Sequence, residues 1–288
     1  MLEHVTRGLY YANVHLLYAS AVGVSAWALT SIPLGSATTK YWIWVATSLN
    51  FIVPVGAILD ALGAPHLTWA SPLAIVGDAA NRLSRSPAAP MLLLAWLSGS
   101  GFLLARLLSR LRAERRGAAA AGPGGPAVEG VLRPRISLPA GIGRVLTDAE
   151  LDAVLIHERI HVRRRDNLIR LIHELGRCGL WFHPLVWIAS SRLAFYRELS
   201  CDESVIRRGR GADLIAALGK LAAPDDAFLL EAGIGSFLGR RLARLASPRG
   251  RHSYAAANTL LAVAFGALLL TGVFETVAHT ACCFIARR

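Results

Sequence analysis

The stretch Leu155-Ile156-His157-Glu158-Arg159-Ile160-His161 contains two histidines and a glutamate in the pattern HExxH. On an α-helix, His157 and His161 lie one turn apart on one face, so both imidazoles can reach a single metal ion. Glu158 is poorly placed as a further ligand, but it can lie beside the metal and take a proton from an attacking water. The pattern therefore predicts the active-site helix of a zinc metallopeptidase, with His157 and His161 as ligands and Glu158 as the general base.

A second acidic pattern lies downstream, in the sequence RELSCDES from Arg197 to Ser204. On a helix, Glu198 and Asp202 share a face. Glu198 can then complete a site of two histidines and one glutamate, while Asp202 accepts the second N–H of a ligand histidine. An isolated pattern of this kind is more often a solvated acidic face among arginines. Its presence after HExxH favours the metal site, with Glu198 as the third zinc ligand.

Composition indicates a membrane protein. Hydrophobic residues make up 54% of the 288 residues, which is more than a soluble domain of this length usually contains. Four apolar stretches are long enough to cross a bilayer as helices, namely Tyr10–Ile32, Tyr41–Leu62, Ala89–Leu108 and Ala255–Val277. The first stretch is long and others follow it, which favours a membrane span over a cleaved signal peptide. We therefore expect a polytopic α-helical membrane protein with about four transmembrane helices.

Arginine clusters set the expected orientation, because basic residues flank the cytoplasmic ends of membrane helices. One cluster follows the third stretch and another precedes the fourth: Arg106, Arg110, Arg112, Arg115, Arg116, Arg240, Arg241, Arg244, Arg249 and Arg251. Everything between the clusters should lie in the cytoplasm, and the N-terminus, the loop Gly63–Ala88 and the C-terminal tail should lie outside. Arg82 and Arg85 in that loop point mildly the other way.

The net charge of +12 does not indicate a nucleic-acid partner. The arginines gather at the predicted membrane edges and do not alternate with aromatic residues along one groove. We interpret them as topology determinants and as contacts to the anionic lipid of the bilayer. The expected location is the cell membrane, in a multi-pass arrangement with a cytoplasmic peptidase domain.

These features divide the chain into five parts. Residues 1–109 should hold three transmembrane helices, and residues 110–130 a basic linker rich in Gly, Ala and Pro. Residues 131–250 should form a cytoplasmic peptidase domain of α+β type. Residues 255–277 should form the fourth transmembrane helix and residues 278–288 a short external tail.

Local signals within the peptidase domain predict three elements. Prolines bracket a short strand in Val131–Pro139, which suits the edge of a sheet and either binds an extended substrate or forms a plain hairpin. Thr147 can cap the motif helix, with Glu150 at the capping-box position. The apolar segment Leu180–Ala189 is interrupted by Pro184 and predicts an interfacial or re-entrant element.

Other histidines, cysteines and arginines are further candidates for the metal site or for the oxyanion. His173 and His183 are rival ligands in principle, but neither has a partner at metal spacing. Cys178 and Cys201 should be reduced buried thiols, because the four cysteines form neither a CxxC pattern nor a disulfide framework. The segment Arg163–Arg165 and His173 are candidates for stabilising the oxyanion.

Several longer motifs, HERIHVRRRDN, WFHPLVW and RELSCDESV, preceded by VLRPRISLP, resemble the BlaR/MecR-type membrane metallopeptidases, the family of β-lactam sensor antirepressors. The resemblance implies zinc bound by His157, His161 and Glu198, with Glu158 as the general base. Members of the family cleave a cytoplasmic transcriptional repressor, and often themselves, after an extracellular penicillin-binding domain senses the drug. This chain ends soon after its fourth predicted span, so we expect it to lack that sensor domain and to depend on a separate sensor partner or on the external loop.

The predicted function is that of a membrane-embedded zinc metalloendopeptidase that hydrolyses a cytoplasmic protein, with a transcriptional repressor as the substrate that the resemblance implies. One alternative is an HtpX-like membrane quality-control protease, which shares HExxH and a later ExxxD but lacks the WFHPLVW and RRRDN context. Another is a catalytically silent membrane signalling scaffold, against which the intact base and three ligands argue.

Overall fold

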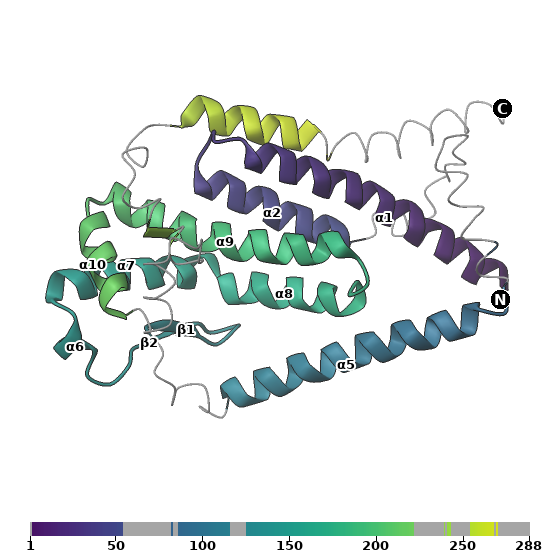
Figure 1. The fold of residues 1–288 in the computed structure, drawn as a ribbon, viewed down its shortest axis with the longest axis horizontal. Coiled ribbons are helices and arrows are strands. Elements are labelled where there is room, and N and C mark those ends of the chain that lie inside the picture. Colours follow the sequence, from purple (N-terminus) through teal and green to yellow (C-terminus); the bar gives the residue numbers. More distant parts are fainter. Residues whose placement is uncertain are drawn as a thin grey trace.

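Helices make up most of the regular structure in the computed structural model, which describes residues 2–53, 82, 86–115, 125–221, 239, 241–242, 254–267 and 269. In chain order the elements are α1 (Leu2–Ser31), α2 (Ala37–Ile52), α5 (Ala89–Arg115), β1 (Ala127–Glu129), β2 (Arg135–Ser137), α6 (Ile142–Val145), α7 (Asp148–Arg164), α8 (Asp166–Gly179), α9 (Pro184–Arg207) and α10 (Gly211–Leu221). An apolar helix, Ala255–Ala267, follows. The arrangement is elongated, with α6, α7 and α10 at one end and the start of α1 at the other (Figure 1).

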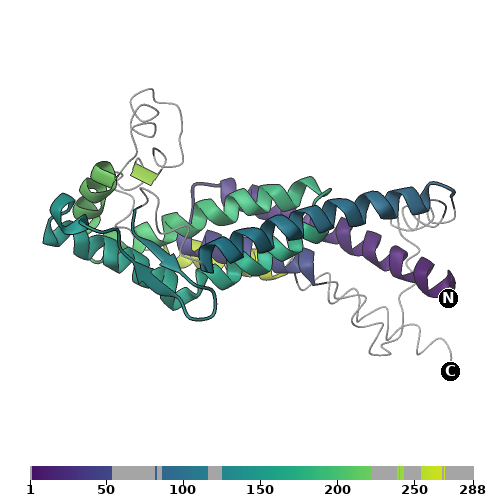
Figure 2. The same ribbon diagram turned by 90° about the horizontal axis from the view of Figure 1, so that it is seen from below.

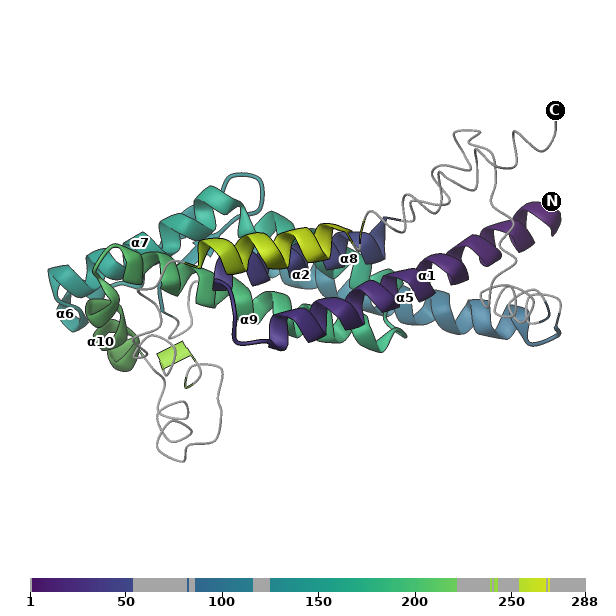
Figure 3. The same ribbon diagram turned by 90° about the horizontal axis from the view of Figure 1, so that it is seen from above.

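The core lies where α2 packs between α1 and α9. Tyr41 and Trp44 of α2 are almost fully buried, in one apolar cluster with Val22 of α1 and Leu193 and Tyr196 of α9. In Figure 3, α1, α2 and the helix Ala255–Ala267 run side by side along this core. A second apolar cluster joins α7 to α10 at the other end of the molecule. Helix α7 therefore packs in the second cluster, and α9 contributes residues to both clusters.

The motif helix α7 begins as the sequence predicts. Thr147 is its N-cap, and the Thr147 hydroxyl and the Glu150 carboxylate bond reciprocally to the backbone N–H groups of Glu150 and Thr147, which confirms the capping box. The same Glu150 oxygen accepts a hydrogen bond from Lys220 of α10 at 2.7 Å. At the other end, Arg165 has φ 56°, a left-handed conformation uncommon outside glycine. This single residue turns the chain from α7 directly into α8.

The apolar segment Leu180–Ala189 differs from the prediction. Helix α8 ends at Gly179, and Pro184 is the first residue of α9, which continues unbroken to Arg207. A proline suits the first helical position, because its backbone nitrogen needs no hydrogen there and its φ is already helical. Pro184 does divide the apolar segment, but as the first residue of the helix that holds Glu198, and the interfacial or re-entrant placement stays a prediction.

The predicted edge strand is half of a two-stranded antiparallel hairpin. β1 pairs with β2 in the register Ala127↔Ser137, Val128↔Ile136 and Glu129↔Arg135, so β1 lies within the segment predicted as linker. Gly130 has φ +84°, and a Cβ there would meet the carbonyl oxygen of Arg133 at 2.8 Å. The Asn167 amide of α8 donates to the carbonyl oxygens of Val128 and Gly130. The hairpin is thus attached to the start of α8.

One helix of the described residues, Pro90–Glu114 within α5, is long and apolar enough to cross a membrane. This matches the predicted span Ala89–Leu108, and its leucine and phenylalanine side chains are largely exposed. The first predicted span is helical within α1, and the fourth is described only as the shorter helix Ala255–Ala267. Helix α2 ends at Ile52, and residues 54–62 of the second predicted span lie outside the described residues, as do most of the loop 63–88 and the tail 278–288. The four-span topology stays a prediction.

Helix α5 is joined to the α8–α9 turn by tryptophans. The Trp96 indole donates to the carbonyl oxygen of Gly179 at 2.8 Å, and the Trp181 indole donates to that of Trp96 at 3.3 Å. A Cβ on Gly99 would meet the Trp181 ring at 2.5 Å, so this contact needs a glycine. In Figure 2, α5 extends from the middle of the molecule toward the end at which α1 starts, and it contacts α8.

We expect Thr147→Ala to lower the free energy of unfolding by about 1 kcal/mol, because the N–H of Glu150 loses its acceptor. Thr147→Ser keeps the hydroxyl and should unfold like the wild type. Thermal unfolding of the detergent-purified chain, followed by circular dichroism, measures both variants. Equal midpoints for Thr147→Ala and the wild type would contradict the capping role.

Candidate metal centre

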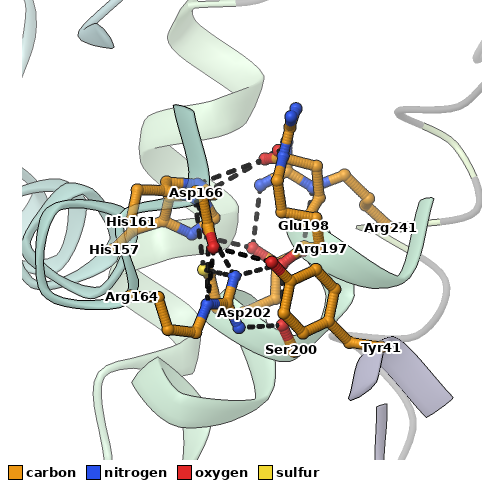
Figure 4. Close-up of polar contacts among 11 residues, drawn as sticks. Tyr41, His157, His161, Arg164, Asp166, Arg197, Glu198, Ser200, Asp202 and Arg241 are labelled. Carbon is orange, nitrogen blue, oxygen red and sulfur yellow. Dashed lines mark hydrogen bonds and ion pairs between the residues drawn. The ribbon is translucent and has the colours of Figure 1, made fainter. Parts of the chain in front are cut away.

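His157, His161 and Glu198 each direct one donor atom to a common point, where α7 faces α9 (Figure 4). The Nε2 atoms of the two histidines are 3.1 Å apart. Oε2 of Glu198 lies 3.4 Å from Nε2 of His157 and 3.7 Å from Nε2 of His161. Tetrahedral ligands at zinc distances of about 2.0–2.1 Å are about 3.3–3.4 Å from one another. The donor triangle, as we call these three atoms, has the size of one face of a zinc site.

A carboxylate lies behind each imidazole. Oδ2 of Asp166 is 2.6 Å from Nδ1 of His161, and Oδ1 of Asp202 is 3.1 Å from Nδ1 of His157, although the second contact lacks the alignment of a regular hydrogen bond. Such partners fix a histidine tautomer and leave Nε2 free for a metal. The sequence analysis places Asp202 behind a ligand histidine, as observed. It does not predict this role for Asp166, which the sequence marks only by its place in the RRRDN segment after the motif.

Burial and ion pairing shift the pKa values of the three donor residues in opposite directions. Burial lowers the pKa of His157, but the carboxylates of Asp202 and Glu198 outweigh it and raise the pKa to about 9. Asp166 likewise outweighs burial at His161 and raises its pKa to about 12. Burial works against ionisation of Glu198, yet the two histidines hold its pKa well below the ordinary value. Without a metal, the charges of His157, His161 and Glu198 thus stabilise one another.

Glu158 has a different environment. Its side chain is buried, and burial raises its pKa above the ordinary value, while the charges of His157 and His161 lower it by less. A carboxylate with a raised pKa is a better proton acceptor near neutral pH. Glu158 therefore has the properties expected of a general base beside the donor triangle.

Arg241 reaches the centre from outside the motif helices. Its Nε and Nη2 donate to the two carboxylate oxygens of Asp202, both at 2.8 Å, and its Nη1 lies 3.6 Å from Oε2 of Glu198. The sequence analysis assigned Arg241 only to the membrane-edge cluster. That interpretation needs correction, because a bidentate guanidinium on a buried carboxylate is a site residue. Nothing in the local sequence distinguishes Arg241 from the neighbouring arginines.

The Arg164 side chain is held in place by contacts with residues around the donor triangle. Its guanidinium donates to Asp166, Ser200 and Cys201 and lies 4.2 Å from the centroid of the Tyr41 ring. Because these contacts occupy it, Arg164 is a poor candidate for the oxyanion donor that the sequence left open. The side chains of the adjacent Arg163 and Arg165 are exposed.

Cys201 is a rival third donor, since its sulfur and one nitrogen each of His157 and His161 lie within 4.8 Å of one another. Its Sγ is 3.7 Å from Nδ1 of His161, the nitrogen that contacts Asp166, so the thiol faces the back of that imidazole. Glu198 faces the Nε2 side instead. Cys178 and Cys201 are both free and buried, as predicted.

The two rival histidines lie away from the donor triangle. Nε2 of His183 is 3.0 Å from the hydroxyl of Ser20 on α1. His173 lies on α8, on the wall of a separate pocket. The sequence analysis disfavoured both as ligands, and the structure does not bring them to the donor triangle.

Comparison with known families agrees with this geometry. Residues 119–213 match the family model described as BlaR1 peptidase M56. This segment is of the BlaR/MecR type. It contains α7, α8 and α9, and so includes the donor triangle, Glu158 and both carboxylates behind the imidazoles. Helices α1, α2 and α5, and also Arg241, lie outside the matched residues.

Two relatives align with part of this chain. Over 82 residues, or 28% of this chain, the identity is 40% with the Regulatory protein BlaR1 of Bacillus licheniformis. It is 26%, over the same length, with the Methicillin resistance mecR1 protein of Staphylococcus aureus. The match spans only 14% of the length of each relative. No solved structure matches the chain.

We expect Asp166→Ala to destabilise the chain by about 3–5 kcal/mol, because it leaves the buried charge of Arg164 without its partner. Asp148→Ala, at the exposed start of α7, is the matched control and should cost at most about 1 kcal/mol. Thermal unfolding of both variants after chelation of metal separates this packing role from any loss of metal. Equal unfolding midpoints for the two variants would contradict it.

Proposed function

We propose that this chain is a zinc-dependent membrane endopeptidase that cleaves a cytoplasmic protein. The main support is the donor triangle, with edges of 3.1, 3.4 and 3.7 Å, in a segment of the BlaR/MecR type. We assign His157, His161 and Glu198 as the zinc ligands and Glu158 as the general base. Two nitrogens and one carboxylate oxygen are a usual donor set for catalytic zinc, which leaves one position for water or substrate.

In the proposed mechanism, His157, His161 and Glu198 would hold a zinc ion, which would supply Lewis-acid activation of the attacking water and of the peptide carbonyl. Glu158 accepts the proton of the water and delivers it to the leaving amine, a role that its raised pKa favours. Asp166 and Asp202 hold the imidazoles in the tautomer whose Nε2 lone pair faces the triangle. Arg241 keeps Asp202 and Glu198 ionised through its contacts with both carboxylates.

We infer that the peptidase domain faces the cytoplasm and acts on a regulatory protein, with a transcriptional repressor as the favoured class. Support for the orientation comes from the arginines at the end of α5, which follow its apolar window. Support for a regulatory role comes from the similarity to the Regulatory protein BlaR1 of Bacillus licheniformis. The bilayer would hold α5, and a separate sensor partner would supply the signal.

We expect about one zinc ion per chain in the wild type. His157→Ala and His161→Ala should lose nearly all of it, whereas Glu158→Gln should keep the metal and lose proteolysis, because the ligands and the base have separate roles. Elemental analysis of the purified chain measures the zinc. Co-expression with a candidate repressor, followed by blotting for its fragments, measures the cleavage.

Glu158→Gln is the matched control, since it preserves the size of the side chain and the ligand set. Full zinc content in a double variant of His157 and His161 would rule out the site. Unchanged cleavage by zinc-loaded Glu158→Gln would rule out the proposed base. Zinc without cleavage in the wild type, with several candidate substrates, would favour the silent scaffold.

Variants of α9 should identify the third ligand. We expect Glu198→Ala to abolish zinc binding and Cys201→Ala to retain it, because Glu198 faces the Nε2 atoms and the thiol does not. Asp202→Ala should weaken zinc binding by about 10–100-fold, as is typical when the partner of a ligand histidine is removed. Titration of the apo chain with zinc against a competing chelator gives these affinities. Loss of zinc in Cys201→Ala with retention in Glu198→Ala would assign the thiolate instead.

Glu203 provides a further comparison on the same helix. We expect Glu203→Ala to have little effect on zinc binding, because Glu203 points about 100° away from the preceding residue, Asp202, around α9. The side chain is nevertheless buried, and it accepts a hydrogen bond from the N–H of Thr38 at the start of α2 at 3.4 Å. Its loss should therefore reduce stability while the zinc affinity stays at the wild-type value.

A further inference from the structure

A pocket of about 180 Å³ lies apart from the donor triangle and has Asp166, the residue that contacts His161, in its wall. Helices α2, α5, α8 and α9 all contribute to its walls. Its volume exceeds the roughly 30 Å³ that one water occupies and is below the roughly 300 Å³ of the smallest drug-sized sites. The space therefore suits a small polyatomic group.

The wall of this pocket has an excess of guanidinium groups. Arg110 of α5, Arg170 of α8 and Arg197 of α9 line it, together with the carboxylates of Asp166 and Glu174. Each carboxylate is already bound by an arginine that does not line the pocket. Asp166 accepts from Arg164, and Glu174 pairs with Arg177. Arg197 is paired with Glu198 at 2.9 Å, so the remaining positive charge comes from Arg110 and Arg170, which share one carboxylate, Glu114.

Among the residues that the structure describes, Arg110 and Arg170 have only weak partners of their own. Both approach the same oxygen of Glu114, each at 3.6 Å, and Arg110 is 3.9 Å from Glu174. These separations exceed hydrogen-bond distance. Burial, followed by the nearby charge of Arg110, lowers the pKa of Arg170. Two like charges thus share one distant carboxylate, an arrangement that an additional anion would stabilise.

His173 gives an independent indication of a ligand. Its side chain is 94% buried on the pocket wall, and its Nε2 has no hydrogen-bond partner among the described residues. Burial, with a smaller contribution from Arg177, lowers its pKa to about 4, so the ring is neutral near pH 7. A neutral ring can donate from Nε2. A buried polar atom without a partner is costly, which indicates that an acceptor occupies the pocket when the site is filled.

We propose that this pocket binds an oxyanion of the phosphate-ester class, with Arg110, Arg170 and Arg197 as charge partners and Nε2 of His173 as a neutral donor. A phospholipid headgroup and a free phosphate compound share this chemistry. Arg110 lies in the last two turns of α5, at the arginine-rich end of the candidate span Pro90–Glu114, where lipid headgroups meet a membrane helix. A bound anion would fasten α5 to α8 and α9, next to the carboxylate that contacts His161.

The first test uses inorganic phosphate and the full detergent-purified chain. Thermal unfolding is followed as phosphate replaces chloride at constant ionic strength. The wild type should show a saturable rise in its unfolding midpoint, and Arg110→Gln/Arg170→Gln should bind phosphate at least about tenfold more weakly, since 1.4 kcal/mol in charge-assisted hydrogen bonds corresponds to a factor of ten. Arg112→Gln, an exposed arginine on the same helix that does not line the pocket, should behave like the wild type.

His173→Leu separates a specific site from a general charge effect, because it removes a donor and no charge. It should also weaken phosphate binding. If the double variant does not fold, the two single arginine variants and His173→Leu provide the same test. Absence of a saturable phosphate effect in the wild type, or equal losses in Arg112→Gln and the pocket variants, would overturn the proposal.

The second test identifies the source of the anion. The chain is reconstituted in nanodiscs of phosphatidylcholine with or without phosphatidylglycerol, and lipids retained after extraction are measured by native mass spectrometry. Retention of phosphatidylglycerol by the wild type but not by Arg110→Gln/Arg170→Gln, with displacement by phosphate, supports a lipid headgroup. Phosphate binding without lipid retention supports a free phosphate compound. Glu158→Gln should bind the anion like the wild type, so this test is independent of peptidase activity.

Discussion

The buried carboxylate of Asp166 connects four helices at the catalytic end. It lies at the start of α8, accepts hydrogen bonds from Tyr41 of α2 and Arg164 of α7, and contacts Nδ1 of His161 at 2.6 Å. Arg164 extends the network to Ser200 of α9. A buried carboxylate is tolerated only when hydrogen bonds and opposite charges satisfy it in this way. The relative positions of α2, α7, α8 and α9 are therefore constrained by the requirement to keep this charge satisfied.

The same constraint determines the geometry of the donor triangle. Arg165 reverses the chain in one left-handed residue, which places Asp166 directly behind His161. Because α9 is unbroken from Pro184, the docking of its apolar first half against α2 also fixes the position of Glu198 further along. The distances among the three donors thus depend on the packing of whole helices. A metal would find its ligands already assembled and would need little reorganisation of the chain.

The features that the sequence could predict are those that depend on neighbours along the chain. The capping box at Thr147 and the HExxH face of α7 follow from helical periodicity alone, and so does the shared face of Glu198 and Asp202. Arg241 could not be recognised, because its contact with Asp202 spans 39 residues of sequence and ends on one arginine among many. Pro184 was expected to interrupt the apolar run, which it does, but the long helix α9 that it starts was not predicted, because a proline in an apolar run can mark either a break or a helix start.

The BlaR/MecR-type segment includes every proposed ligand but not every group that stabilises the buried charges. The hydroxyl of Tyr41 on Asp166 comes from α2, and the guanidinium of Arg241 on Asp202 comes from a part of the chain beyond the match. Both carboxylates lie behind ligand histidines, so removal of either outside group would leave a buried ion less satisfied and change the basicity of an imidazole. The parts of the chain that flank the segment therefore have an electrostatic role at the candidate metal centre. A displacement of α2 or of Arg241 would alter the centre through these two contacts, which gives a physical route from outside the matched segment to the candidate active site.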